Sequence, residues 1–181
     1  MTVEKTPLEG CLLIKPRVFK DERGSFFESY NHQVFQKETG LHLEFIQDNQ
    51  SISQRGALRG IHLQTGAHAQ TKLVRVVQGE VLDVAVDLRK KSPTFGKTYA
   101  TILNDENNHQ LLIPKGFGHG FITLSNNAIF AYKCDNYYHK ASEAGVIYND
   151  PSLNIDWMLP KEELILSEKD QELPSLEKFR S

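Results

Sequence analysis

The segment Gly79–Leu88 constrains the fold most, because it alternates with the two-residue period of a β-strand. Aliphatic side chains occupy one face from Leu82 to Leu88, and Asp83 and Asp87 lie on the other face. Similar short runs predict further strands at Leu43–Asn49, Thr71–Val77, Thr98–Leu103, Gln110–Pro114, Gly120–Leu124 and Ala128–Cys134. Many short strands at this spacing are typical of a β-sandwich or barrel.

Turns and helices are expected only between and beside these strands. Asn126-Asn127 predicts a hairpin turn. Helical pattern is confined to Gln33–Thr39 and to the C-terminal region, where Pro160 and Ser167 can each start a helical turn. No repeat, low-complexity tract or linker divides the 181 residues, a length that suits one domain with a substantial core. We therefore expect a single domain over residues 1–181.

Composition excludes several classes of protein. A formal net charge of −2 argues against a basic surface that binds nucleic acid. Cys11 and Cys134 lie far apart without CxxC spacing, which predicts two buried thiols rather than a disulfide framework or a thiolate zinc site. The first residues lack the apolar run of a signal peptide, and no segment approaches the length of a membrane span. We expect a cytoplasmic protein with no membrane or nucleic-acid partner.

The first candidate for catalysis lies in the predicted strand Leu58–Gln64. The two-residue period places Leu58, His62 and Gln64 on one face, where the histidine points inward. Taken alone, such a residue is more often a core histidine with satisfied hydrogen bonds, because its environment can tune it either way.

Two further residues favour a catalytic role for His62. Lys72 shares a strand face with Val74, so it points into the barrel unless the opposite face is the inner one, and a buried lysine is costly without a counter-charge. Tyr132 alternates with Phe130, a pattern more typical of a core tyrosine whose hydroxyl finds a partner. A base, a cation and a weak acid are nevertheless the groups that remove a proton beside a ketone and return it to the other face.

The segment Pro114–His119 matches the P-x-G-x-x-H element that many cupins, the jelly-roll proteins, carry in their second motif. Metal-binding cupins also have a His-x-His pair and a glutamate, but here His62 is followed by leucine and glutamine. At most His62, His119 and His68 are available, which is incomplete for the usual three or four ligands. We therefore expect no metal.

An ordered set of motifs runs nearly from end to end of the chain. It consists of Phe19–Gly24, Phe27–Tyr30, Phe45–Asn49, Leu58–His62, Lys72–Arg75, Ser92–Gly96, Ile113–Phe121, Tyr132-Lys133, Tyr137-Tyr138, Asn149–Pro151 and Leu166–Asp170. Together these motifs resemble the dTDP-4-dehydrorhamnose 3,5-epimerases, which are cofactor-free sugar-nucleotide isomerases. The resemblance implies an all-β fold, the double-stranded β-helix or jelly roll of the cupins, with short peripheral helices.

The same resemblance implies the catalytic groups. His62 would be the base, Asp170 its partner, Lys72 the cation that stabilises the enolate, and Tyr132 the acid on the opposite face. Asp170 would otherwise be interpreted as part of a capped surface turn, since nothing local to it indicates catalysis.

The resemblance also implies the substrate-binding positions, and their residue types fit that role. Arginines suit a diphosphate, amides and a glutamate suit base and sugar edges, and an aromatic ring suits a pyrimidine. The positions are Arg23, Glu28, Gln47, Asn49, Arg59, Glu143 and Lys169, with His119 lining the pocket and Tyr138 stacking on thymine. Arg59 lies an odd number of residues from His62, so either Gly60 marks a bulge or Arg59 serves another surface.

The expected reaction is epimerisation at C3 and C5 of dTDP-4-dehydro-6-deoxy-D-glucose to dTDP-4-dehydro-L-rhamnose, in dTDP-L-rhamnose biosynthesis. Leu63 and Tyr148 replace aromatic residues usual in the family, so an epimerase of one carbon of a related dTDP-4-keto-6-deoxyhexose is the alternative. A metal cupin oxygenase or isomerase and a noncatalytic sugar-nucleotide-binding jelly roll are hypotheses of other classes. The family is generally homodimeric, and we expect a homodimer here.

Overall fold

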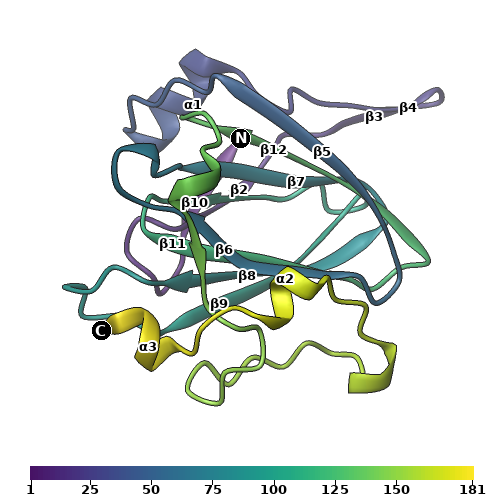
Figure 1. Ribbon diagram of the computed structural model, residues 1–181. Helices are drawn as coiled ribbons and strands as arrows, with labels where there is room; N and C mark the ends of the chain where they lie inside the picture. Colours follow the sequence, from purple (N-terminus) through teal and green to yellow (C-terminus); the bar gives the residue numbers. More distant parts are fainter.

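The chain folds into two β-sheets that face each other, with short helices at the edges (Figure 1). The computed structural model describes all of residues 1–181. The larger sheet has the order β1-β2-β10-β7-β12-β5 and contains β1 (Thr2–Lys5), β2 (Leu12–Lys15), β5 (Gln47–Gln54), β7 (Lys72–Gln78), β10 (Gln110–Ile113) and β12 (Asn127–Cys134). The smaller sheet has the order β13-β6-β11-β8-β9 and contains β6 (Leu58–Gln64), β8 (Glu80–Asp87), β9 (Thr98–Asn104), β11 (Phe117–Thr123) and β13 (Glu143–Gly145). This architecture confirms the predicted all-β, cupin-type jelly roll.

The remaining elements lie outside the two sheets. Strands β3 (Phe19–Asp21) and β4 (Gly24–Phe26) form a hairpin that projects from the body (Figure 1). Three 3₁₀ turns occur at Gly66–His68, Lys140–Ser142 and Lys161–Glu163, and the α-helices are α1 (His32–Thr39), α2 (Glu168–Gln171) and α3 (Leu176–Arg180). No helix has the length and apolar character needed to span a membrane.

The helical predictions are confirmed at three places. Helix α1 covers the predicted segment and begins where the Asn31 side chain accepts a hydrogen bond from the Val34 N–H. Pro160 precedes a 3₁₀ turn, and Ser167 caps α2 by accepting from the Asp170 N–H. Helix α3 was not predicted, although Ser175 caps it in the same way.

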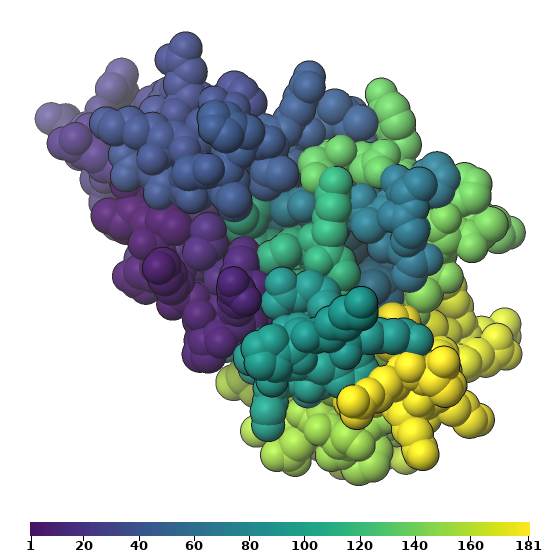
Figure 2. Space-filling model, turned by 90° about the vertical axis from the view of Figure 1, so that its left-hand side faces the viewer, coloured from purple at the N-terminus to yellow at the C-terminus, as the bar shows by residue number.

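Apolar side chains form three clusters, two of which lie on the two faces of the smaller sheet. One cluster lies between the sheets and includes Val74, Val81 and Phe130, together with the buried thiol of Cys11. A second cluster covers the outer face of the smaller sheet, where the even-numbered residues of β8 pack against the C-terminal segment. Figure 2 shows the C-terminal residues in yellow against the teal segment near residue 90. Strand β8 is therefore buried on both faces, and its alternating side chains belong to two different clusters.

Two details of the predicted strands are wrong. The strand expected at Leu43–Asn49 begins only at Gln47 and continues to Gln54, because Leu43 and Phe45 pack against Phe35 of α1 on the outer face of the larger sheet. The Asn126-Asn127 turn does not form a hairpin, since β11 and β12 belong to different sheets. The turn carries the chain from one sheet to the other, which is the connection a jelly roll requires.

Candidate active site

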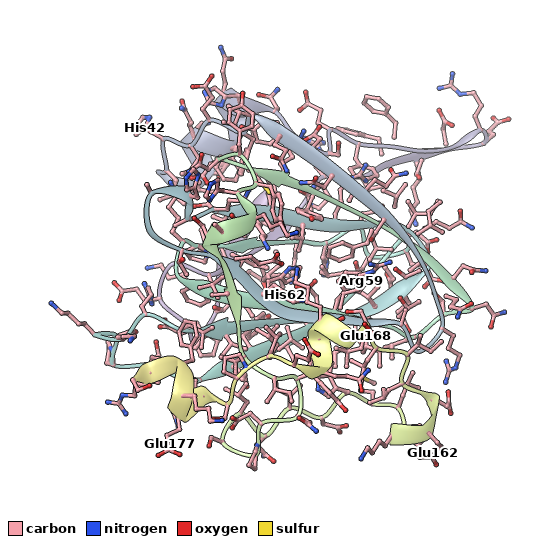
Figure 3. The ribbon with its side chains drawn as sticks, viewed as in Figure 1. His42, Arg59, His62, Glu162, Glu168 and Glu177 are labelled. Carbon is pink, nitrogen blue, oxygen red and sulfur yellow. The ribbon has the colours of Figure 1, made fainter.

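A cavity of about 720 Å³ opens between the two sheets and reaches the C-terminal segment. It brings together every predicted site residue except Arg23 and Glu28. The predicted residues that line it are Gln47, Asn49, Arg59, His62, Lys72, His119, Tyr132, Tyr138, Glu143, Lys169 and Asp170. Figure 3 shows His62 and Arg59 near the middle of the molecule, beside the helix that carries Glu168. This volume is within the range of small-molecule sites.

A bulge in β6 places both Arg59 and His62 in the cavity. His62 pairs with His119 whereas Arg59 pairs with Phe121, so three steps along β6 match two along β11. Leu58 consequently packs in the outer cluster, and the prediction that it shares a face with His62 is wrong. Of the two alternatives for Arg59, the bulge at Gly60 is confirmed.

Glycine is required at this bulge for two reasons. Gly60 has a φ of +135°, a conformation that L side chains rarely adopt. A Cβ atom at this position would lie 2.4 Å from the Gly120 Cα. The close approach of β6 and β11 therefore depends on a residue without a side chain.

His62 is held by a saturated carboxylate. Asp170 Oδ1 lies 2.5 Å from His62 Nε2 and also accepts from the Gly60 N–H, while Oδ2 accepts from the Ser167 hydroxyl and N–H. Burial opposes ionisation of Asp170, but the hydrogen bonds from His62 and Ser167 outweigh it and lower the pKa of this carboxyl. Since an ionised carboxylate only accepts hydrogen bonds, Nε2 carries the hydrogen and Nδ1 carries a lone pair.

Lys72 and Tyr132 enter the same cavity from the larger sheet. Lys72 faces inward with Val74, as predicted. Desolvation lowers the pKa of its ammonium group more than the nearby Cys134, Asp83 and Glu143 raise it. The Lys72 Nζ atom lies 5.8 Å from the centre of the Tyr132 ring. Burial also raises the pKa of Tyr132, which keeps the phenol protonated.

His119 has a carboxylate partner that sequence reasoning missed. Asp83 Oδ2 lies 2.8 Å from His119 Nε2, and both side chains are buried. The other oxygen, Oδ1, has no hydrogen-bond partner. The available signal was the alternation of Gly79–Leu88, which places Asp83 on the face opposite the aliphatic residues. Ser167 was predicted only as the start of a helix, although it also holds Asp170.

Glu143 links the residues at the outer end of the cavity. Its carboxylate accepts hydrogen bonds from the Lys169 ammonium and, at 3.0 Å, from the Tyr138 hydroxyl. Burial opposes ionisation of Glu143, but these two donors outweigh it and lower its pKa. Its Oε1 atom also lies 3.7 Å from His62 Nδ1. Polar groups of Gln47 and Asn49 complete this end of the site, joined by a hydrogen bond of 3.1 Å.

Arg23 and Glu28 lie outside the cavity. Arg23 sits at the tip of the β3–β4 hairpin, with its side chain 89% exposed and paired with Asp21. Glu28 accepts a hydrogen bond from Asn31 at the start of α1.

The histidines considered as metal ligands do not converge. His62 and His119 are each bonded to a different aspartate, and His68 stacks on His139 with ring centres 4.0 Å apart. No group of three or more histidine, cysteine, aspartate or glutamate side chains is arranged to hold a metal ion.

Comparison with known proteins shows the family to which the chain belongs. The family model described as dTDP-4-dehydrorhamnose 3,5-epimerase matches residues 5–178. The dTDP-4-dehydrorhamnose 3,5-epimerase of Shigella flexneri is 52% identical over 170 residues, which are 94% of this chain and 93% of the relative.

Two solved structures are similarly close. The enzyme of the same name from Elizabethkingia anophelis has a TM-score of 0.95 and 53% identity and covers 100% of this chain and 99% of its own. The dTDP-6-deoxy-D-glucose-3,5-epimerase of Legionella pneumophila, solved in complex with dTDP-4-keto-L-rhamnose, has a TM-score of 0.93 and 46% identity over 97% of this chain and 93% of its own. The chain belongs to the dTDP-4-dehydrorhamnose 3,5-epimerase family.

Proposed function

We propose that the protein converts dTDP-4-dehydro-6-deoxy-D-glucose to dTDP-4-dehydro-L-rhamnose by inverting C3 and C5, in dTDP-L-rhamnose biosynthesis. Both carbons are next to the C4 ketone, so removal of either proton gives an enolate that shares its charge with the ketone oxygen. The side chains of one domain, residues 1–181, supply the groups for this chemistry without a cofactor.

His62 takes the proton. With Nε2–H bonded to Asp170, the lone pair on Nδ1 accepts a hydrogen, and the ionised Asp170 stabilises the imidazolium that forms. Lys72 is a half-buried cation that lines the cavity without a hydrogen-bond partner, which suits an oxyanion that develops only during the reaction. Tyr132 returns a proton to the opposite face of the same carbon, and the configuration is inverted.

The nucleotide occupies the outer end of the cavity. Tyr138 presents an exposed ring for thymine, and Arg59 and Lys169 supply positive charge for the diphosphate. Gln47, Asn49, Glu143 and His119 offer hydrogen-bonding groups to the base and sugars.

The proposal includes a homodimer. Phe19 and Phe26 of the β3–β4 hairpin are 51% and 69% exposed in one copy, and an isolated two-stranded hairpin is only marginally stable in water. A second copy that receives this hairpin would gain Arg23 and Glu28 for its own nucleotide site. If so, mixing Arg23→Ala with His62→Ala protein restores activity in mixed dimers, whereas independent monomers stay inactive.

The proposal places the enzyme in the cytoplasm, where the two buried thiols, Cys11 and Cys134, stay reduced.

One observation carries the proposed reaction: an oriented histidine, an ammonium group without a hydrogen-bond partner and a phenol line the same cavity. The test is incubation of purified protein with dTDP-4-dehydro-6-deoxyglucose in heavy water, followed by NMR of the sugar. Deuterium at both C3 and C5 is the expected result. Deuterium at one carbon would support a monofunctional epimerase. Leu63, which lines the cavity, would then be the first residue to substitute. Binding without label would support a noncatalytic protein, and loss of label on chelation would support a metal cupin.

A further inference from the structure

Glu143 occupies an unusual place between the proposed base and the solvent. Strand β13 pairs with β6 so that Gly145 lies opposite His62 and Glu143 lies opposite Gln64. The carboxylate of Glu143 thereby reaches the His62 ring with Oε1 and the Tyr138 hydroxyl with Oε2.

The neighbouring atom of His62 is the one that receives the proton. Nδ1 is buried and has no hydrogen-bond partner. The closest carboxylate oxygen to it is Glu143 Oε1, at 3.7 Å. While the imidazole is neutral, this atom offers only a lone pair to the carboxylate. Once Nδ1 is protonated, the same contact becomes an attraction between an N–H donor and a negative acceptor.

The proposed reaction creates a need for such a neighbour. Each inversion leaves the abstracted proton on His62 and turns Tyr132 into a phenolate. Before a second carbon can react, His62 must lose its proton and Tyr132 must gain one. Asp170 cannot carry this proton away, because four hydrogen bonds saturate it and its side chain is only 7% exposed.

We propose that Glu143 relays the proton from His62 to solvent between the two inversions. The Nδ1–H bond breaks, an Oε1–H bond forms, and the N–H electron pair stays on Nδ1 as the lone pair of the restored base. The carboxylic acid then gives its proton to water at the cavity mouth, beside the exposed Tyr138. Water supplies the proton that restores the Tyr132 phenol, so the net charge of the site returns to its starting value.

The surroundings of Glu143 suit this role. The ion pair between Lys169 and Oε1 keeps the carboxylate charged in the resting site, so the carboxylic acid formed by proton transfer is short-lived and passes its proton on to water. Its side chain is 17% exposed, compared with 7% for Asp170, so Glu143 is the better connected of the two carboxylates to solvent. This inference rests on the proposed epimerisation.

The test is a single-turnover experiment in heavy water with enzyme in excess, so that weaker substrate binding does not limit the rate. Wild-type protein should give a doubly inverted, doubly labelled sugar. Glu143→Gln removes the proton acceptor but keeps the size of the side chain. We expect the second inversion to slow about 100-fold more than the first, which is the lower end of general acid–base effects. Glu143→Asp should recover part of the second step.

Chemical rescue separates a relay from a structural role. In Glu143→Ala, added formate should accelerate the second inversion and leave the first unchanged. Equal slowing of both inversions in Glu143→Gln, or no response to formate, would overturn the relay. If wild-type protein labels only one carbon, the experiment is repeated with substrate in excess. The relay then predicts a burst of one inversion per site followed by slow turnover in Glu143→Gln, and the absence of this burst would refute the relay. If wild-type protein labels neither carbon, the proposed function itself fails.

Discussion

Asp170→Asn should separate the tautomer of His62 from its position. Asparagine has nearly the same shape as aspartate, but it offers one acceptor oxygen and an NH₂ donor. In the native site, Oδ2 receives two donors from Ser167, and Oδ1 receives the Gly60 N–H at 3.3 Å and His62 Nε2 at 2.5 Å. The amide cannot satisfy all four donors in either orientation.

The two orientations bound the expected loss. If the amide oxygen faces Ser167, the NH₂ group faces Nε2, the imidazole hydrogen moves to Nδ1, and the base loses its lone pair. The matching change in a serine-protease triad lowers kcat about 10⁴-fold. If the oxygen faces His62, the tautomer survives and only the charge is lost. A charge-assisted hydrogen bond contributes about 1.5–3 kcal/mol, which corresponds to about 10- to 150-fold. We therefore expect kcat to fall by about 10- to 10⁴-fold.

The assay is the initial rate of deuterium uptake from heavy water at saturating substrate, with the melting temperature measured in parallel. Glu168→Gln is the matched control, because it removes the same charge from the exposed side of the same helix. An Asp170→Asn rate within twofold of wild type in a folded protein would refute the assignment of Asp170 as the partner of the base.

Three further predictions address the bulge, the lysine and the acid stability of the fold. Gly60→Ala should lower the free energy of unfolding by more than the about 1–3 kcal/mol expected for a strained backbone alone. Gly24→Ala is the control, because Gly24 has a similar φ of +129° and no neighbour within 4 Å. Equal losses of stability in urea unfolding would contradict the argument from the Gly120 contact. Burial lowers the pKa of Lys72 below its ordinary 10.5, so kcat/KM should begin to decline with rising pH below that value. In an active Lys72→Arg variant the decline should move to higher pH. An alkaline decline at the same pH in this variant would exclude Lys72 as the group that titrates. Burial disfavours the charged form of Asp87, but hydrogen bonds from Arg89, Ser92 and Thr94 lower its pKa from 3.8 to about 2, so its stabilisation is complete above pH 3.8 and is lost as the pH falls through about 2. Melting temperatures of Asp87→Asn should therefore depend less on pH in this range, and a dependence equal to wild type would contradict this.

Local pattern predicted most of the strands because side-chain alternation depends only on neighbouring residues. The inward position of Lys72 followed from the same alternation, since Val74 and Val76 share its face. Leu43–Asn49 failed because its apolar residues serve α1 rather than the inner core. For the register of β6 the local pattern left two alternatives, and it could not decide for the bulge at Gly60 because this depends on the close approach of Gly120 on another strand.

Long-range pairs limited what could be predicted of the site. Asp170 lies 108 positions from His62, and only the family resemblance indicated their pairing. The pairing of Asp83 with His119 was not predicted, because the two residues lie 36 positions apart and neither local pattern specifies the other. Arg23 and Glu28 were predicted for the same site, but the fold of one chain leaves them outside the cavity. Such pairings depend on the folded topology, which the local pattern does not encode.

The most direct test compares His62→Ala and Tyr132→Phe with wild type in heavy water, using dTDP-4-dehydro-6-deoxyglucose as substrate. The central claim is that one group removes the proton and another returns it to the opposite face. His62→Ala should therefore abolish uptake of deuterium into the sugar, whereas Tyr132→Phe should still exchange deuterium but form little inverted product. Inversion at the wild-type rate in Tyr132→Phe, or exchange at the wild-type rate in His62→Ala, would contradict the two-group mechanism.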